Sequence, residues 1–344
     1  MLISVYVPLA VTAVLTVCAP RLARLLAPRP AAWALACTAL VTTVGWAGSL
    51  ALLAFTGIAQ IPAVAAEGRW SVPALRAEDP VLLIVAVVSA LVLLAGTVSL
   101  LLAAVRQARH LLWARRECAR LSGDSELAVL DEDTPHAFAL PGAPGRIVVS
   151  RGMLRCLDNE EREALLAHER AHLRGRHHVF QSLWRLAAAL NPLLRPLADA
   201  GGFALERWAD EEAAARVGSR RVVARAVGRA ALASLPRTAS TPPLAVTGGA
   251  VPQRVRALLA PPPPRRTLPI AGGALLLALC CAGLANATSD SDKMLDDAQR
   301  ARCAASFTQT SASRPEDLRA RPPHGCCEHR MRGGADEWRA REGG

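Results

Sequence analysis

A five-residue segment, residues 168–172, contains the side chains best placed to do chemistry. It reads His-Glu-Arg-Ala-His, the HExxH pattern. Two histidines four residues apart on a helix lie about 40° apart around its axis, so both imidazoles can reach one metal ion. Glu169 would then lie beside that ion, where it can polarise a metal-bound water instead of binding the metal. The pattern is typical of zinc-dependent peptide hydrolysis, although five residues alone also occur by chance.

A zinc ion held by His168 and His172 needs a third protein ligand and an open position for water. That ligand must come from a separate element, because neighbouring carboxylates on the same helix point elsewhere. Glu206 is the best candidate, in a helix predicted at about residues 203–216. Asp210, one turn later on the same face, could accept a hydrogen bond from a ligand histidine. The alternative is an exposed acidic helix, because two further glutamates follow Asp210.

Two more histidines, His177 and His178, follow the motif closely. If the helix continued through them, they would lie at about 180° and 280° from His168, off the metal-binding face. Gly175 could end the helix before that point. We expect a structural role for both histidines.

Short strands and a capped helix are expected to position the motif. Residues 123–150 contain short apolar runs separated by Gly and Pro, which is typical of a small antiparallel sheet. Such a sheet needs a helix to pack on. Asp158 or Asn159 can cap that helix, with Glu160 and Glu161 in its first turn. A further apolar segment at 179–190 is expected to end at an Asn-Pro break.

Four stretches of the sequence lack charge and are apolar enough to span a bilayer. A membrane core of about 30 Å needs about 20 apolar residues in a helix, with about 17 as the lower limit. The last three stretches meet this length comfortably and the first only narrowly. A cleaved signal peptide is the alternative for the first, although a basic n-region is lacking. The four stretches are residues 2–18, 31–60, 81–105 and 267–287.

Arginines flank these predicted spans unevenly. Lys and Arg near a span favour its cytoplasmic side. Arginines are frequent in the first loop, after the third span and before the fourth, whereas the second loop is nearly neutral and two aspartates follow the fourth span. We therefore expect both termini outside and residues 106–266 in the cytosol. The net charge of +11 is then largely a topology signal, and we expect no direct nucleic-acid binding.

The domain organisation follows from these spans. We expect a membrane domain with three helices at 1–105, a cytosolic domain at 106–266, a fourth span at 267–287 and a disordered extracytoplasmic tail at 288–344. Four tail residues could be drawn as a metal site, but the two adjacent cysteines lack the spacing of a zinc knuckle, and we favour a solvated tail. These four are His324, Cys326, Cys327 and His329.

The HExxH motif, the downstream Glu206 and Asp210, and the preceding strand segments together resemble the gluzincin membrane metallopeptidases. Two related groups share this pattern: the HtpX and CAAX prenyl endopeptidases, and the BlaR/MecR antirepressors. Members of the second group place a cytosolic zinc domain between a third and a fourth span, so the order of spans here matches that group better. The resemblance covers roughly residues 1–287.

The resemblance implies an α-helical membrane protein with about four transmembrane helices and a cytosolic α+β zinc-peptidase domain. It implies His168, His172 and Glu206 as ligands of one Zn²⁺ per chain, Glu169 as general base and Asp210 as the residue that orients a ligand. The strand at Phe138, Ala139 and Leu140 would be an edge to which substrate adds.

By the same resemblance, the substrate would be a cytosolic repressor of the BlaI/MecI type, cleaved in signal transduction. The chain departs from the full β-lactam sensors, because only residues 288–344 follow the last span and they contain no Ser-x-x-Lys sequence. The alternatives are an HtpX-like protease for membrane-protein quality control and a non-catalytic signalling scaffold that retains a metal fold.

Overall fold

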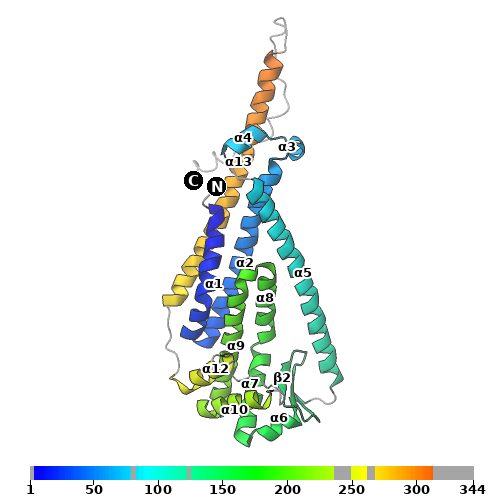
Figure 1. Cartoon of the computed structure of the whole chain (residues 1–344), viewed down its shortest axis with the longest axis vertical. Helices are drawn as coiled ribbons and strands as arrows, with labels where there is room; N and C mark the ends of the chain where they lie inside the picture. The colour runs from blue at the N-terminus through cyan, green and yellow to red at the C-terminus, as the bar shows by residue number, and fades with distance from the viewer. Residues whose placement is uncertain (1–3, 79–82, 122–124, 236–248, 262–267, 313–344) are drawn as a thin grey trace, which may run out of the picture.

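Four long apolar helices make up one end of the molecule (Figure 1). The computed structural model describes residues 4–78, 83–121, 125–235, 249–261 and 268–312. By length and composition, four helices in this part of the chain qualify as candidate membrane spans. They are α1 (Val7–Leu25), which follows a short 3-10 turn η1 (Ser4–Tyr6), α2 (Pro28–Ala59), α5 (Leu83–Arg120) and α13 (Leu268–Ala312).

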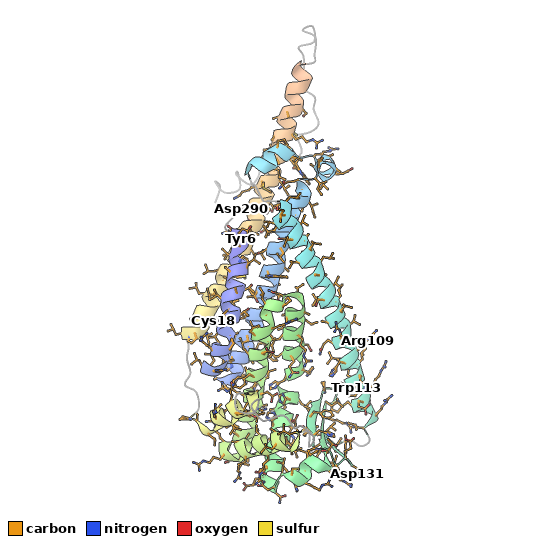
Figure 2. The ribbon with its side chains drawn as sticks, in the orientation of Figure 1. Tyr6, Cys18, Arg109, Trp113, Asp131 and Asp290 are labelled. Atoms are coloured by element: carbon orange, nitrogen blue, oxygen red, sulfur yellow. The ribbon has the colours of Figure 1, made fainter. Side chains whose placement is uncertain are left out.

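The third and fourth of these helices extend well beyond the charge-free stretches of the sequence. Helix α5 continues from the span to Arg120 and brings its polar end beside the sheet. Figure 2 shows Arg109 and Trp113 on that end, with Asp131 beyond them, whereas Asp290 lies toward the opposite end of the molecule. The boundary expected at residue 105 is therefore inside a continuous helix.

The expectation of a disordered tail from residue 288 is wrong for residues 288–312, which continue α13. The short helices α3 (Pro62–Gly68) and α4 (Val72–Glu78) lie against this extension. Met294 and Ala298 are buried there together with Leu75, and this apolar contact explains why the helix continues. Residues 313–344, including the four tail residues drawn as a possible metal site, lie outside the described part of the chain.

A helical hairpin packs against the candidate spans. It consists of α8 (His177–Leu190), the 3-10 turn η2 (Pro192–Leu194) and α9 (Arg195–Val217), and it lies beside α1, α2 and α5 (Figure 1). At its tip, Leu190 packs against Trp46 and Leu50 of α2. The expected break at Asn191-Pro192 is confirmed, since α8 ends at Leu190. The segment expected as a separate cytosolic domain thus shares an apolar core with the membrane helices.

Two contacts hold α9 in this position. Arg207 is buried and its guanidinium donates a 2.8 Å hydrogen bond to the carbonyl oxygen of Ala23, near the end of α1. The last carbonyls of a helix lack partners within the helix, so this contact satisfies one of them. Gly201 permits close packing on α8, because a Cβ at this position would lie 2.7 Å from the Trp184 ring. Helix α9 is therefore fixed against both α1 and α8.

A three-stranded sheet lies at the other end of the molecule. Its strands are β1 (Leu127–Leu130), β2 (Ala137–Leu140) and β3 (Arg146–Ser150), in the order β1-β3-β2. The expected antiparallel pairing is correct for β2 with β3 and wrong for β1 with β3, which are parallel. Strands β1 and β2 lie on opposite sides of β3 and run in opposite directions. Strand β3 can therefore be antiparallel to only one of them.

The helix with the HExxH motif, α7 (Asn159–Arg174), begins at a capping box. The Asp158 side chain accepts a hydrogen bond from the N–H of Glu161, and the Glu161 side chain accepts one from the N–H of Asp158. Glu161 is fully buried and forms a 2.9 Å ion pair with Arg229. The flanking helices are α6 (Arg151–Cys156), α10 (Arg220–Ala233) and α12 (Ala250–Leu259). This cap fixes the residue at which α7 starts. It therefore fixes the position of the HExxH residues along α7, opposite α9.

Candidate metal centre

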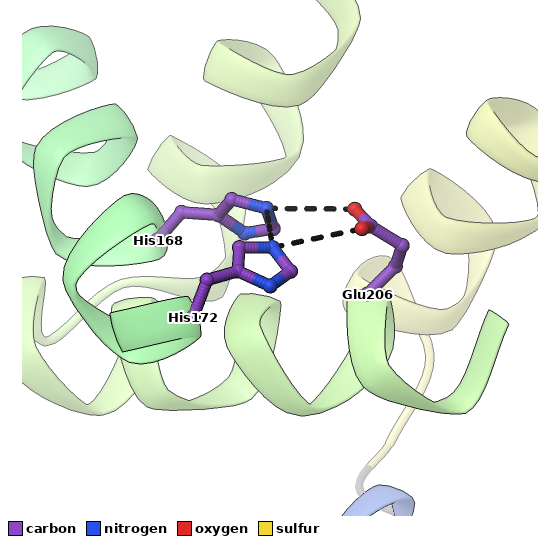
Figure 3. A group of neighbouring side chains, drawn as sticks. All are labelled: His168, His172 and Glu206. Carbon is purple, nitrogen blue, oxygen red and sulfur yellow. Dashed lines mark hydrogen bonds and ion pairs between the residues drawn. The ribbon is translucent and has the colours of Figure 1, made fainter. Parts of the chain in front are cut away.

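The side chains of His168, His172 and Glu206 converge on one point between α7 and α9 (Figure 3). The Nε2 atoms of the two histidines are 3.1 Å apart. One carboxylate oxygen of Glu206 lies 3.5 Å from Nε2 of His168, and the other lies 3.5 Å from Nε2 of His172. The structure thus brings the three predicted ligands together from two separate helices.

These separations fit a tetrahedral zinc ion. Zinc binds histidine nitrogen and carboxylate oxygen at about 2.0–2.2 Å, so two of its tetrahedral ligand atoms lie roughly 3.3–3.5 Å apart. The two nitrogens are 3.1 Å apart, and each lies 3.5 Å from one of the two Glu206 oxygens, so all three side chains are within reach of one ion. Two neutral imidazoles and one carboxylate are also the donor set typical of a catalytic zinc site that keeps a fourth position for water.

Each ligand histidine has a second residue at its other ring nitrogen. Nδ1 of His168 lies 3.0 Å from Oδ1 of Asp210, which is almost fully buried. Nδ1 of His172 lies 2.8 Å from Nδ1 of His177. The Asp210 carboxylate can only accept, so this contact favours a proton on Nδ1 of His168 and leaves its Nε2 for a metal. Either ring can donate in the contact between His172 and His177, and Nε2 of His172 is free for a metal when His172 is the donor. Asp210 is where the sequence analysis expected it.

The sequence analysis did not assign His177 to the site. The off-face angles hold only if the helix continues past Gly175, which is itself a possible end; the helix does end at Arg174, and Arg176 adopts a left-handed conformation with φ of 48°. The chain therefore changes direction, and His177 at the start of α8 is buried against His172. No pattern in the sequence marks this reversal, because Arg is not a residue that favours positive φ.

Arg254 of α12 is the other residue of the site that was missed. Its guanidinium binds both carboxylate oxygens of Asp210, at 2.7 and 2.8 Å, and one oxygen of Glu206 at 2.8 Å. Arg254 therefore holds the third ligand and the orienting carboxylate in one arrangement. In the sequence it is one of several arginines before the fourth span, and only the packing of α12 on α9 distinguishes it.

Glu169 lies beside the three ligands and is nearly buried. Burial is the main cause that raises the pKa of Glu169 above its usual value, and the positive charge of His168 opposes it. The main-chain N–H of Ala139 donates a hydrogen bond to the Glu169 carboxylate, which favours its charged form. A carboxylate with a raised pKa next to a metal position is suited to accept a proton near neutral pH.

The three candidate ligands shift one another's pKa values. Burial lowers the pKa of His168, but its contacts with Asp210 and Glu206 outweigh burial and raise that pKa to about 9. Burial and the neighbouring His168 lower the pKa of His172 to about 4. Burial raises the pKa of Glu206, but His168 and Arg254 hold it at about 2. The buried Asp210 and the half-buried Glu206 thus attract one positive charge to the position of His168, where a metal cation would replace the proton.

Two hollows meet at this centre and share Ala137, His168, Glu169 and Glu206 as lining residues. The larger, of about 540 Å³, extends over apolar side chains of α10 toward Arg254. The smaller, of about 350 Å³, extends past His172 and His177 toward α8. The centre therefore lies at the middle of a continuous depression that follows β2.

The three residues predicted as a substrate edge are placed differently from one another. Strand β2 is at the edge of the sheet, and Phe138 and Ala139 line the smaller hollow. Leu140 does not line it, because its side chain is buried with Ala114 and Cys118 of α5. The edge strand therefore faces the site through Phe138 and Ala139, and not through Leu140.

Residues 103–212 match the family model described as Peptidase family M48. The matched segment begins on α5 and continues through the sheet and α7 to α9, so it includes both histidines, Glu169, Glu206 and Asp210. A protease HtpX homolog from Thermococcus sibiricus is 37% identical over 60 residues. That alignment covers 17% of this chain and 20% of the relative, so the chain spans about a fifth of that protein. No solved structure matches at a comparable level.

The M48 match agrees with the geometry of the site. It covers the two helices that carry the three candidate ligands, and a family of metallopeptidases needs such a cluster. Together with the four long apolar helices, the match and the HtpX relative support a metalloprotease of the membrane. Arg254 lies outside the matched segment.

Proposed function

We propose that this protein is a zinc-dependent membrane endopeptidase with one zinc ion per chain. The observation that carries the proposal is the convergence of His168, His172 and Glu206 at zinc-compatible separations, with Glu169 beside them. A zinc ion at these ligands would polarise the scissile carbonyl and lower the pKa of its water toward about 7. The M48 match over the same helices supports this reading.

Glu169 is the general base in this proposal. Its carboxylate is largely buried next to the candidate ligands and lines both hollows. Glu169 would take a proton from the attacking water and then deliver it to the nitrogen of the leaving amine. The N–H of Ala139 orients the carboxylate by its hydrogen bond.

Substrate binding follows from the direction of the β2 main chain. In an antiparallel pair, alternate residues direct their N–H and C=O to the partner strand and the others direct theirs away. The N–H of Ser150 donates to the carbonyl of His136, which places Ala137 and Ala139 in the outward set. The hydrogen bond from Ala139 to Glu169 agrees with this assignment. An extended peptide would therefore add to β2 through the outward groups that remain, the N–H and C=O of Ala137 and the C=O of Ala139, because Glu169 accepts from the N–H of Ala139.

The proposed substrate is a cytosolic repressor of the BlaI/MecI type. The supporting observation is the order of elements, with the site located between the third and fourth candidate spans. An HtpX-like role in the quality control of membrane proteins is the second candidate, and the similarity to an HtpX homolog favours it. Proteomics of cells with the active protein and with Glu169→Gln distinguishes the two. A single stabilised transcription repressor supports the first role, and many stabilised membrane proteins support the second.

The proposed topology places both termini outside and the site in the cytosol, on the basis of the arginine distribution. Cys156 on α6 and Cys303 on α13 lie at opposite ends of the molecule and suit single-cysteine variants. A membrane-impermeant maleimide added to intact cells should label Cys303 and should label Cys156 only after lysis. The reverse pattern contradicts the proposed orientation.

The proposed activity is tested with purified full-length protein and the variant Glu169→Gln. Glu169→Gln should bind zinc in the wild-type amount and lose cleavage of a model protein substrate, because the amide cannot accept the proton. Glu163→Gln is the matched control, since Glu163 is exposed on the same helix. Equal cleavage by Glu169→Gln and wild type would exclude the proposed mechanism. A wild-type protein without stoichiometric zinc would favour the non-catalytic scaffold.

A further inference from the structure

A hollow of about 600 Å³ lies at the junction between the candidate spans and the metal-binding helices, outside the metal centre. It is formed by the first turns of α2, the end of α7 with the turn that follows, and the second half of α9. Its lining is dominated by two residue types, arginine and tryptophan: Arg29, Trp33, Arg174, Arg176, Trp208 and Arg216.

The charge of this hollow is only partly compensated by protein groups. Glu212 is its one acidic lining residue; it lies 3.6 Å from Arg174 and accepts a 3.0 Å hydrogen bond from the Trp208 indole. Within the described parts of the chain, no ion pair is formed by the other three arginines, Arg29, Arg176 and Arg216. Three unpaired guanidinium groups around one concave surface attract an anion with several acceptor oxygens.

The position of the hollow along α2 indicates where that anion comes from. Arg29 is in the first turn of this candidate span, and Trp33 is one turn further in, with 55% of its surface exposed. Tryptophan and arginine at the end of a span are typical of the layer of lipid head groups. With α2 as a span, Arg29 and Trp33 place the hollow at the level of the head groups, at the end of that span where α7 and α9 pack.

Part of the hollow is held rigidly. The Arg29 guanidinium lies over the Trp208 ring, 5.4 Å from its centroid, and Trp208 is itself buried against His177. The edge of the Trp33 ring contacts Phe180 of α8, with centroids 4.9 Å apart. These contacts restrict the aromatic walls, so a ligand would meet a preformed surface.

We propose that this hollow binds the phosphate group of an anionic phospholipid head. Arg29, Arg176 and Arg216 would bind the phosphate oxygens, and Trp33 would lie along the glycerol and the first part of the acyl chains. A bound head group would hold the end of α7 and the second half of α9 at the membrane surface. The proposal does not depend on peptidase activity, because none of these residues belongs to the metal centre.

The test uses full-length protein in detergent, titrated with dioleoylphosphatidylglycerol or dioleoylphosphatidylcholine and analysed by native mass spectrometry. The double variant Arg29→Gln/Arg216→Gln should weaken binding of the anionic lipid by at least about tenfold, since one charged hydrogen-bonded contact is worth about that factor and two are removed. The matched control is Arg21→Gln/Arg221→Gln, which removes the same charge from exposed arginines outside the hollow. It should leave binding close to the wild-type value.

Two outcomes overturn the proposal: equal loss of anionic-lipid binding in both double variants, and no loss in either. Sodium phosphate and glycerol 1-phosphate are competed against the lipid to identify the source of the phosphate. If they displace the lipid at equal concentration, the site is one for soluble phosphates and the lipid assignment is wrong. Size-exclusion elution and zinc content show whether each variant folds. If the double variant does not fold, the single variants Arg29→Gln and Arg216→Gln are measured in its place.

Discussion

Arg254 and Asp210 form a two-point ion pair next to the candidate metal ligands. The guanidinium Nε and Nη2 atoms lie 2.8 and 2.7 Å from the two carboxylate oxygens, and the same arginine reaches Glu206. Both partners are shielded from solvent. Arg254 comes from α12, the last described helix before α13, whereas Asp210 and Glu206 come from α9. The position of a metal ligand thus depends on the helix that precedes the fourth candidate span.

Replacing Arg254 should weaken zinc binding. Arg254→Gln leaves the buried Asp210 carboxylate without its cation and removes the contact that holds Glu206, so we expect a loss of zinc affinity of about 10–100-fold. The measurement is competition with a chelator of known affinity. Arg256→Gln on the same helix is the control, because Arg256 is exposed. Similar affinities for the two variants would show that the ion pair does not position the ligand.

Replacing His177 should lower zinc affinity more than it lowers the stability of the fold. His177→Phe keeps an aromatic ring beside Trp208 but removes the nitrogen that lies 2.8 Å from Nδ1 of His172. We expect zinc affinity to fall about tenfold or more, because the ring of His172 loses the partner that orients it. His178→Gln, one residue along, should leave affinity within about threefold of wild type. A wild-type affinity for His177→Phe contradicts this role.

The candidate metal centre could be predicted from the sequence where its geometry is local, and less well where it depends on tertiary packing. The spacing of His168 and His172 and of Glu206 and Asp210 places each pair on one face of a helix, and the structure brings the four together. His177 was missed because the left-handed Arg176 ends the helical register. Arg254 was missed because nothing in its local sequence separates it from neighbouring arginines.

The fold, too, could be predicted where it depends on local sequence and not where it depends on tertiary packing. The four apolar helices could be located because a span needs a long charge-free stretch. The hairpin of α8 and α9 could not be placed beside them, because α8 spans only His177–Leu190 and such a length also suits an ordinary core helix. The part of α13 beyond residue 288 packs on Leu75 of α4 through Met294 and Ala298, and such contacts from distant residues cannot be read from the local sequence.

The hairpin can be tested through two adjacent glycines of α9. A Cβ at Gly201 would lie 2.7 Å from the Trp184 ring, whereas a Cβ at Gly202 meets no atom within 4 Å. Gly201→Ala should lower the free energy of unfolding by about 1–3 kcal/mol through overpacking. Gly202→Ala should raise it by up to about 1 kcal/mol, because alanine favours the helix. Thermal unfolding in detergent measures both, and equal effects would contradict the packing of α8 on α9.

The pH dependence of cleavage should report Glu169. A general base must be deprotonated, and burial raises the pKa of Glu169 above its usual value. As pH falls through that raised pKa, the carboxylate gains a proton and kcat/KM decreases. The acidic limb should therefore have its midpoint above about 4.3, the value of an unperturbed glutamate. Zinc content measured over the same range separates this effect from metal loss, and a midpoint at or below that value would contradict the role of Glu169.

Zinc titration of the metal-free protein tests the central claim most directly. Full-length protein stripped with a chelator is titrated with zinc while cleavage of a protein substrate is followed. We expect cleavage to be absent without zinc, to increase linearly, and to reach its maximum at one zinc per chain. His168→Ala and Glu206→Ala should not reach this maximum at the same zinc concentration, because each lacks one of the three ligands. Cleavage that is independent of zinc, or equally restored in these variants, would contradict the account.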